Sequence, residues 1–382
     1  MKRFIYVTIA LATVVISCTK SSIVDVPEAQ KTPITFDTYN GKIPMTKASE
    51  ITHANIQKIY VTGFQEKDRT NYGSYYMNPV DGLNKSNGSW TYTPLAYWPA
   101  SGTLDFVAYG SNTPRTVNGG PGTLVPVILP ATDNKYSYTS FTYTVPPLAA
   151  EQQDLIAAYV EPKELSTSVV KFNMNHLLSR IGFKLETIGS GTVVTINNVI
   201  LHGTYNTKAA INLTSDKMLT VASDSPTTSS YSLFTSGESF TTNGLTGTTT
   251  TDGHTSYDIY ATTSTATDFT AAPNNRYMMI LPGEVGDLNN IEDQYDVDGD
   301  KNKTEDTPPY IEVNYELGSE SRTARLHLPN VDEDTNWTFE AGNAYEFVFQ
   351  ISISEIKFTG IVKGWDEDYN GDGKEDFEDY IY

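Results

Sequence analysis

Alternation of apolar and polar residues dominates this chain and is clearest near its C-terminal end. Residues 343–365 read NAYEFVFQISISEIKFTGIVKGW. Successive side chains of a strand point to opposite faces of a sheet, so a period of two predicts β-structure with one buried face. The predicted buried face carries Tyr345, Phe347, Phe349, Ile351 and Ile353, and the other face carries Glu346, Val348, Gln350, Ser352 and Ser354.

Shorter strand-like segments recur along the chain at fairly regular spacing. Examples are IQKIYVTGF at 56–64, LDFVAYG at 104–110 and VTINNVILHGTYN at 194–206. Gly, Pro and Asn separate these segments, and no alternation of strands with helices is visible. This organisation predicts an all-β protein built from two tandem β-sandwiches, divided near residues 163–168.

Two segments are less regular. Residues 169–186, VVKFNMNHLLSRIGFKLE, predict either one long bent strand or a short helix around NHLLSR that leads into a strand. Residues 223–256 are rich in Ser, Thr and Gly, and predict a long surface loop of the second sandwich.

The first residues predict export and a lipid anchor. Lys2 and Arg3 precede a short apolar run, FIYVTIALATVVIS, which has the form of a signal peptide and is short for a membrane span. Cys18 is the only cysteine of the chain, and the preceding VIS resembles a permissive bacterial lipobox. Cleavage before Cys18 and acylation of its thiol would tether the chain to a membrane. The alternative is an ordinary secretory signal with an incidental cysteine.

The net charge and the motif content argue against several classes of function. The formal net charge of −20 argues against nucleic acid or anionic lipid as partners. The five histidines are scattered, and no GxSxG, P-loop or HExxH motif occurs, so we expect neither an enzyme nor a transition-metal site. An aromatic platform for sugars is conceivable at Trp90, Tyr92, Tyr97 and Trp98, but packing in a sandwich core is the preferred interpretation.

The acidic C-terminal segment predicts a calcium loop. DYNGDGKEDFED at 368–379 matches the ligand spacing of an EF-hand loop, with a glycine at the sharp turn. The alternative is a solvated acidic tail. A second acidic cluster at 293–306 is interpreted as an ordinary turn, because its glycine is misplaced for such a loop. The predicted Ca²⁺ ligands are Asp368, Asn370, Asp372, Lys374 through its carbonyl, Asp376 and Asp379.

Several segments, taken in order, resemble one known family. They include ITFDT at 34–38, TKA at 46–48, WTYTPLAYWP at 90–99, LDFVAYG, VKFNMNHLLSRIGFKL, YMMILPGE, and the closing AGNAYEFVFQIS with VKGW. The resemblance is to the fimbrillin-like lipoproteins of Gram-negative anaerobes, which build surface fimbriae, and it runs from about residue 30 to residue 365. The family fold consists of two transthyretin-like β-sandwiches.

The resemblance also implies a mode of assembly. A trypsin-like protease would cut after Lys47 and release ITFDT as a removable first strand, and a strand from Ile356–Trp365 of a neighbouring subunit would replace it. The partners would be other fimbrial subunits, the outer membrane through the lipid, and an unidentified host or bacterial surface ligand. A glycan-binding surface lipoprotein of a nutrient-uptake system is the alternative function.

The expected layout follows from these observations. It comprises a signal peptide at 1–17, a lipid-proximal tether at 18–33, an N-terminal β-sandwich at 34–165, a C-terminal β-sandwich at 166–365 and an acidic tail at 366–382.

Overall fold

The computed structural model describes most of the chain outside its two ends and several connecting segments. The described residues are 32–39, 56–65, 76–77, 79, 81–110, 129–132, 135–152, 154–164, 169–188, 193–214, 220–223, 226–262, 277–286, 309–328, 337–352, 356–364 and 380–381. Within these ranges the regular structure is almost entirely β-strand, with one 3₁₀ turn, η3 (Ala149–Glu151). The prediction of an all-β fold is confirmed. None of the described residues forms a helix long and apolar enough to cross a membrane.

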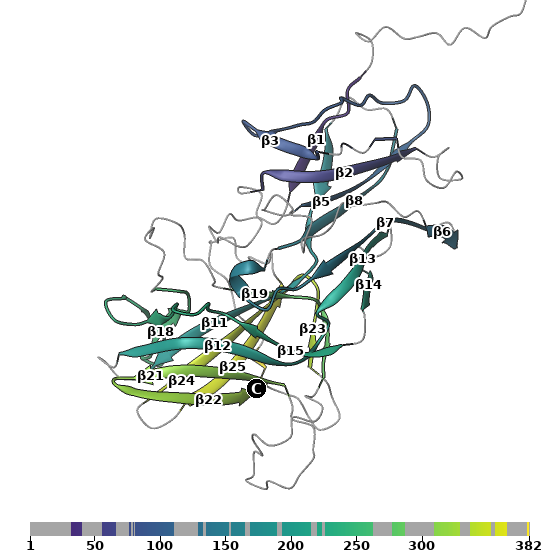
Figure 1. The fold of residues 1–382 in the computed structure, drawn as a ribbon. Coiled ribbons are helices and arrows are strands. Elements are labelled where there is room, and N and C mark those ends of the chain that lie inside the picture. The colour runs from purple at the N-terminus through teal and green to yellow at the C-terminus, as the bar shows by residue number, and fades with distance from the viewer. Residues whose placement is uncertain are drawn as a thin grey trace, which may run out of the picture.

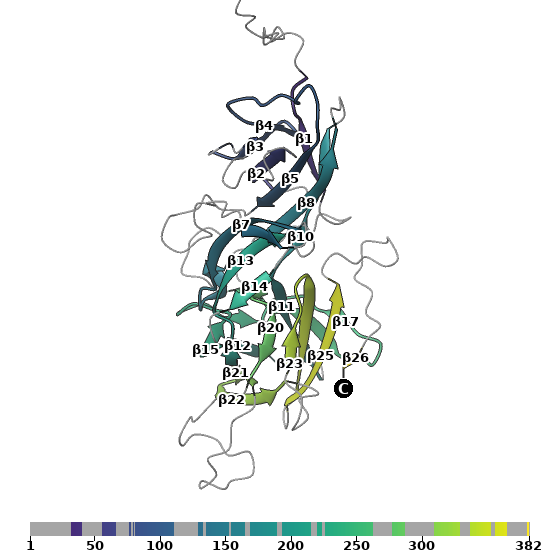
Figure 2. The same cartoon turned by 90° about the vertical axis from the view of Figure 1, so that its right-hand side faces the viewer.

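The strands form sheets that follow one another along an elongated molecule (Figures 1 and 2). One end holds a six-stranded sheet, in the order β10 (Asn175–His176), β8 (Ile156–Lys163), β5 (Leu104–Gly110), β2 (Lys58–Gln65), β3 (Leu83–Ser86) and β4 (Ser89–Thr91). Beside it, β1 (Phe36–Tyr39) pairs with β9 (Val170–Asn173). The middle holds a four-stranded sheet of β14 (Thr220–Ser223), β13 (Lys208–Thr214), β7 (Lys135–Thr144) and β6 (Leu129–Thr132).

Two larger sheets form the other end. The first contains β17 (Thr248–Thr249), β18 (Thr255–Asp258), β11 (Ser179–Thr187), β24 (Asn343–Ile351), β25 (Ile356–Gly364) and β26 (Tyr380–Ile381), with β19 (Tyr277–Ile280) also paired to β11. The second contains β15 (Thr227–Ser232), β12 (Val194–Tyr205), β21 (Tyr310–Leu317) and β22 (Glu320–His327), with β16 (Phe240–Thr241) also paired to β12. A small sheet joins β20 (Gly283–Val285) to β23 (Trp337–Phe339).

The central strand of the six-stranded sheet, β5, is buried on both faces. Every residue of β5 is buried, and alternate side chains enter different cores. Phe106 and Ala108 belong to a cluster at the N-terminal end, which we call the N-terminal core. Val107 and Tyr109 belong to a larger cluster, the central core, which continues between the two C-terminal sheets. The sheet is therefore the wall that the two cores share.

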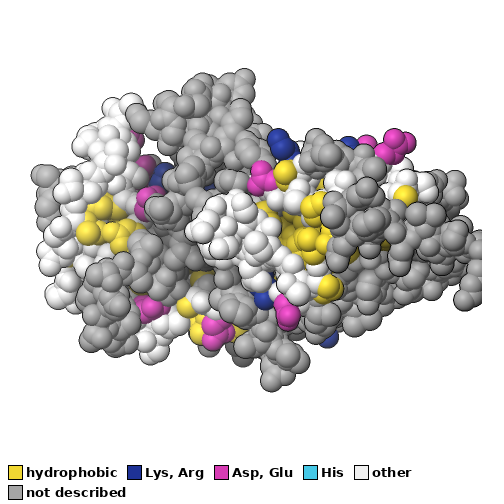
Figure 3. Space-filling model, turned by 90° about the horizontal axis from the view of Figure 1, so that it is seen from above, with side chains coloured by type: hydrophobic (Ala, Val, Ile, Leu, Met, Phe, Trp, Pro, Cys, Tyr) yellow, Lys and Arg dark blue, Asp and Glu magenta, His cyan; other side chains and the backbone are white. Residues whose placement is uncertain are grey.

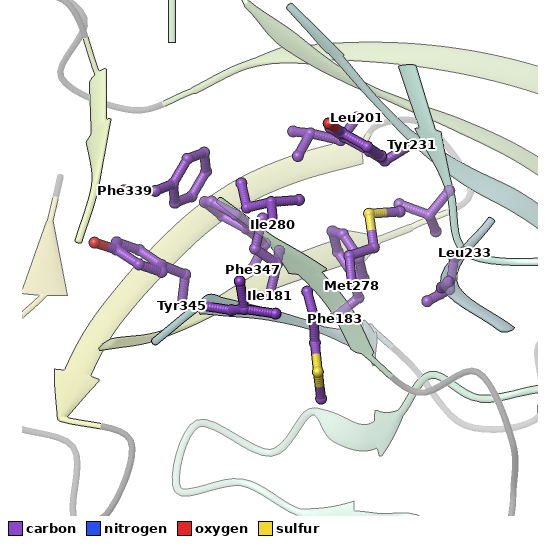
Figure 4. Packing of buried hydrophobic residues seen from close by; sticks show 14 of the residues in the cluster. Ile181, Phe183, Leu201, Tyr231, Leu233, Met278, Ile280, Phe339, Tyr345 and Phe347 are labelled. Atoms are coloured by element: carbon purple, nitrogen blue, oxygen red, sulfur yellow. The ribbon is translucent and has the colours of Figure 1, made fainter. Parts of the chain in front are cut away.

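The C-terminal sheets enclose most of the central core. Alternating residues of β11 and β24 point into it, as the period of two requires. Phe183 stacks on Phe349 with ring centroids 5.7 Å apart. Figure 4 shows side chains of this cluster from strands distant in sequence; those labelled are Ile181, Phe183, Leu201, Tyr231, Leu233, Met278, Ile280, Phe339, Tyr345 and Phe347.

Strand pairing crosses the expected boundary between the two sandwiches. Residues 170–173 and 175–176, expected in the C-terminal sandwich, pair instead with β1 and β8 of the N-terminal sheets. β7 pairs with β13 over most of its length, which ties segments from both halves of the sequence into one sheet. The physical reason is that the chain crosses between the sheets several times, whereas sequence spacing shows only neighbours along the chain. The division into two domains stays a prediction.

One local expectation was wrong, and the sequence pattern did not show the course of a second segment. Residues 227–241 do not form a surface loop: β15 pairs with β12, and Tyr231, Leu233, Phe234 and Phe240 are buried in the central core. Because the segment is rich in Ser and Thr, its isolated apolar residues did not form a recognisable strand pattern. The 343–365 segment is a hairpin of β24 and β25, not one strand. A period of two is the same in both arms, and no Gly or Pro stands between them in the sequence.

A buried histidine–carboxylate contact lies where the N-terminal sheet meets the C-terminal sheets. Nδ1 of His176 lies 2.9 Å from Oδ2 of Asp154, and the two side chains are 2% and 0% exposed. Beside this pair, Oε1 of Gln152 accepts a hydrogen bond from the Met279 amide at 2.6 Å. Side chains from the segment between η3 and β8 therefore contact both β10 and β19.

Two half-buried histidines flank Tyr310 on the outer face of the β12–β21–β22 sheet. The strand register places His202 and His327 opposite Tyr310 from its two sides. His202 stacks on the Tyr310 ring with centroids 4.6 Å apart. Burial lowers the pKa of both imidazoles below the ordinary value of 6.5; at His202 the Glu312 charge opposes this effect and Arg325 adds to it.

These two histidines predict a loss of stability in mild acid. Because their folded-state pKa values are lowered, the unfolded chain binds more protons below about pH 6.5 and becomes relatively more favourable. We expect the urea midpoint to fall between about pH 7 and pH 5, and to fall less in a His202→Gln, His327→Gln double variant. Parallel curves for both proteins would contradict this assignment.

Candidate functional site: the first strand and its groove

The first strand, which we define as residues 32–39, is bound along both of its edges. On one edge the Ile34 amide donates to the Ala96 carbonyl at 3.0 Å, and the Trp98 amide donates to the Thr32 carbonyl at 2.9 Å. On the other edge β1 pairs with β9 in parallel register, beginning with Phe36 opposite Val170. The strand therefore fills a groove between residues 96–98 and β9.

Alternate side chains of the first strand enter the N-terminal core. Ile34 is 0%, Phe36 5% and Thr38 2% exposed, whereas Thr35 is exposed and Asp37 is intermediate. The Phe36 ring occupies an aromatic pocket of the groove. Its centroid lies 5.7 Å from that of Tyr92, 5.5 Å from that of Phe106 and 5.6 Å from that of Phe172.

Polar groups of the groove also contact the strand. The Tyr92 hydroxyl donates to the Ile34 carbonyl at 2.9 Å, and burial raises the pKa of Tyr92 to about 12, so the phenol keeps its proton at neutral pH. Burial lowers the pKa of Lys85, and the Asp37 charge partly opposes this shift. One polar group of the strand is unsatisfied: the Thr38 hydroxyl is buried and has no hydrogen-bond partner.

The first strand contributes a small part of the N-terminal core. The strand supplies three buried side chains, and it pairs with β9 over four register positions only. Its removal would expose the aromatic pocket together with unpaired main-chain groups on both walls, and such a groove binds another extended strand. ITFDT fills the groove and completes the N-terminal core, and its removal stays a prediction. Sequence reasoning missed β9 as a wall, although its VKF repeats the apolar–polar–Phe pattern of ITF.

The structure bears differently on the residues predicted for lipidation, cleavage, calcium binding and strand donation. Cys18, Lys47 and the six predicted calcium ligands, residues 368–379, lie outside the described residues, so lipidation, cleavage and calcium binding stay predictions. Among the residues that the structure describes, no three His, Cys, Asp or Glu side chains gather to hold a metal ion. Within the predicted donor segment, residues 356–364 form β25, which pairs with β24 over nine register positions.

The aromatic residues considered as a sugar platform do not form one. Trp90 and Trp98 are 8% and 6% exposed in the N-terminal core, and Tyr92 packs against that core. The preference for core packing is confirmed at Trp90, Tyr92 and Trp98, whereas Tyr97 is intermediate in burial and belongs to neither core.

The surface near the groove is partly apolar. Leu95 and Val169 are 48% and 43% exposed, and each precedes a residue that hydrogen-bonds to the first strand. Figure 3 looks down on the end that carries the N-terminal sheet, and shows separate hydrophobic patches between charged groups.

Comparisons with solved structures find fimbrial and adhesion proteins. A fimbrial protein from Bacteroides vulgatus is 17% identical, with 87% of this chain and 99% of that chain covered and a TM-score of 0.48. A putative cell adhesion protein from Bacteroides ovatus is 14% identical, with 88% and 98% covered and a TM-score of 0.48. The fimbrial anchor protein Mfa2 from Porphyromonas gingivalis is 11% identical, with 87% and 98% covered and a TM-score of 0.34. No curated protein sequence matches the chain.

The family comparison covers most of the chain. The sequence matches the family described as fimbrillin-like over residues 46–365, which include both walls of the groove and the C-terminal sheets. The match begins beside Lys47, after the first strand. This is a family of structural surface proteins and not of enzymes. The chain belongs to the fimbrillin-like family.

Proposed function

We propose that this protein is a structural and adhesive subunit of a fimbrium, exported as a lipoprotein and assembled by donor-strand exchange. The observation that carries the proposal is the first strand, whose three buried side chains and two paired edges complete a core built by the rest of the chain. Membership of the fimbrillin-like family supports the fimbrial role.

The proposed export and lipid anchoring are inferred from the first residues of the sequence. The signal-like run leads to the single cysteine, Cys18, whose acylation would attach the chain to the outer membrane at the cell surface. Each buried lipid methylene adds about 0.8 kcal/mol of membrane affinity, so several acyl chains would hold the chain firmly. The residues between Cys18 and the first strand would act as a flexible tether.

Cleavage would convert this anchored precursor into a polymerising subunit. Lys47 lies between the first strand and β2, so a cut after it severs the only covalent link between the strand and the groove. The strand is then held by non-covalent contacts alone, and a strand from another subunit competes for its place. A donated strand satisfies the same main-chain groups and buries equivalent apolar surface.

A protease experiment tests this proposal directly. The chain with Cys18→Ser, purified without its signal, is treated with trypsin under mild conditions, and the products are separated on SDS gels without boiling. Lys42 and Lys47 are the only Lys or Arg residues between β1 and β2. We expect a ladder of SDS-resistant polymers from this protein and from a Lys42→Ala variant, which keeps Lys47. A matched Lys42→Ala, Lys47→Ala variant should form none.

Two results would refute the proposal. One is a cleaved chain that remains monomeric at high concentration, and the other is a Lys42→Ala, Lys47→Ala variant that forms the same ladder as the Lys42→Ala chain. The alternative glycan-binding function predicts discrete monomers that are retarded in gels containing polysaccharide.

A further inference from the structure

We propose that β22 is an acid-released edge strand: in mild acid it detaches from β21 while the rest of the C-terminal sheets stays folded. The trigger is the row of rings formed by His202, Tyr310 and His327 on the outer face of the β12–β21–β22 sheet. The proposal does not depend on strand exchange at the first-strand groove.

Few buried contacts hold β22 in place. Among the described strands of its five-stranded sheet, it is the one with no buried residue. It pairs with β21 over eight register positions and lies at the edge of the described sheet (Figure 1). On its inner face only Ala324 and Leu326 pack against the central core, and both are partly buried. Strands with few buried contacts are the first to open locally.

The two ends of β22 allow it to move as a unit. A tight turn of Gly318 and Ser319 links it to β21, and Gly318 has a φ of +66°. At the other end Leu328 is 2% exposed, and its amide donates to the Pro309 carbonyl at 3.2 Å. The strand therefore lies between a glycine turn and a buried anchor, so it can leave β21 without displacing Leu328 from the core.

On the outer face, polar and aromatic contacts attach β22 to β21. Nε of Arg325 donates to Oε2 of Glu312 at 3.0 Å. The guanidinium carbon of Arg325 also lies 5.4 Å from the centroid of the Tyr310 ring. The Thr323 hydroxyl donates to Oδ1 of Asn314 at 2.7 Å. These contacts depend on charge and hydrogen bonding, so a change of charge beside them weakens the attachment.

Tyr310 lies between two imidazoles that are poorly placed to accept a proton. His202 stacks on the Tyr310 ring with centroids 4.6 Å apart, and His327 lies opposite Tyr310 from β22. Among the described residues, the buried Nε2 of His202 and the buried Nδ1 of His327 have no hydrogen-bond partner. An imidazolium has two N–H donors, so protonation places a donor where no acceptor lies, and this is unfavourable.

The charges beside this row also become unbalanced in acid. Glu312 favours the protonated form of His202, but the same carboxylate binds Arg325, whose charge acts in the opposite direction. β15 carries no charged side chain, and the described residues of β20 contribute only the exposed Glu284. With His327 and His202 both protonated, three cations would share the Glu312 carboxylate.

Detachment of β22 relieves this unfavourable protonation. It places His327 in water and removes Arg325 from His202, so the detached form binds more protons below about pH 6.5 than the closed form. The detached fraction therefore rises as the pH falls. Release gives up the contacts of one strand without buried residues, whereas unfolding gives up the central core, so release is the easier response. It leaves the edge of β21 open to an added strand.

The reactivity of a single thiol on the inner face of β22 tests the proposal. An Ala324→Cys chain in the Cys18→Ser background has one cysteine. Its rate of reaction with dithiodipyridine is measured at about pH 7.5 and about pH 5. Each rate is divided by that of a Ser319→Cys chain, whose thiol lies in the exposed turn and corrects for the pH dependence of the reagent. We expect this ratio to rise at least about fivefold in acid.

Two variants are the matched controls. Val313 is fully buried on β21 and lies opposite Ala324, so a Val313→Cys thiol should stay unreactive at both pH values. In a His202→Gln, His327→Gln, Ala324→Cys chain the rise in acid should disappear, because glutamine does not titrate. A ratio that is constant with pH overturns the proposal, as does a rise that persists in the glutamine variant. Equal reactivity of the Val313→Cys and Ala324→Cys thiols in acid shows unfolding of the whole sheet and also overturns it.

Hydrogen exchange supplies a second measurement that needs no variant to fold. Amide exchange of the chain purified without its signal is followed by mass spectrometry at the same two pH values and corrected for the intrinsic exchange rates. We expect protection of β22 to fall at least about fivefold in acid, while that of β24 in the neighbouring sheet is unchanged. Constant protection of β22, or a parallel loss in both strands, overturns the proposal.

Discussion

Replacing Phe36 with alanine is expected to lower the free energy of unfolding of the uncleaved chain by about 3–5 kcal/mol. The ring is 5% exposed and contacts three other aromatic rings, all from separate elements of the N-terminal core. Its removal loses transfer free energy and leaves a cavity. The measurement is urea unfolding followed by tryptophan fluorescence, because Trp90 and Trp98 lie in the same core.

Two controls give this prediction its specificity. Thr35→Ala, at the exposed neighbouring position, should change stability by no more than about 0.5 kcal/mol. After cleavage and assembly, the Phe36→Ala and unmodified chains should become equally stable, because the first strand has left the groove. A difference that persists in the assembled fibre would show that the strand stays in place.

The second large loss of stability is expected from Asp154→Ala, at the junction of the N-terminal and C-terminal sheets. The substitution removes the carboxylate that contacts the buried His176, and the loss of a hydrogen-bond partner by a buried polar group costs about 1–3 kcal/mol, and more for a charged group. The N-terminal and C-terminal sheets meet at this pair, so we expect protease sensitivity to increase at the junction as well as a lower urea midpoint. Limited proteolysis and urea unfolding of the same samples check both effects.

A double-mutant cycle distinguishes the loss of the His176–Asp154 contact from general destabilisation. Asp154→Ala, His176→Ala and the double variant are compared with the unmodified chain. We expect the double variant to be clearly more stable than the sum of the single effects predicts, because no unpaired buried group remains. Simple additivity would show that the two side chains contribute independently.

Much of the strand content was predictable from the sequence. The segments at 56–64, 104–110 and 194–206 correspond to β2, β5 and β12, because strand periodicity is a local property. The local sequence pattern did not predict the structure where the same composition or periodicity is compatible with two different structures. The Ser/Thr-rich stretch at 223–256 contains core strands, and the alternating stretch at 343–365 contains two antiparallel strands.

The candidate site was predictable only in part. ITFDT was identified as the removable strand from family resemblance, and its alternation indicated which side chains would be buried. The walls of the groove were not predictable, because residues 96–98 and β9 are far apart in sequence and meet only through folding. Likewise, the partner of His176 is 22 residues away and was not visible as a motif.

The sequence by itself determined the β-class, the alternation of buried and exposed positions and the candidate segments for export, cleavage and calcium binding, because each depends on local order along the chain. Only the tertiary structure decided which strands enclose Phe36, which hydroxyl lacks a partner and where the two cores share a wall. Those properties depend on long-range packing, in which many alternative pairings satisfy the same local pattern and side-chain fit selects one of them.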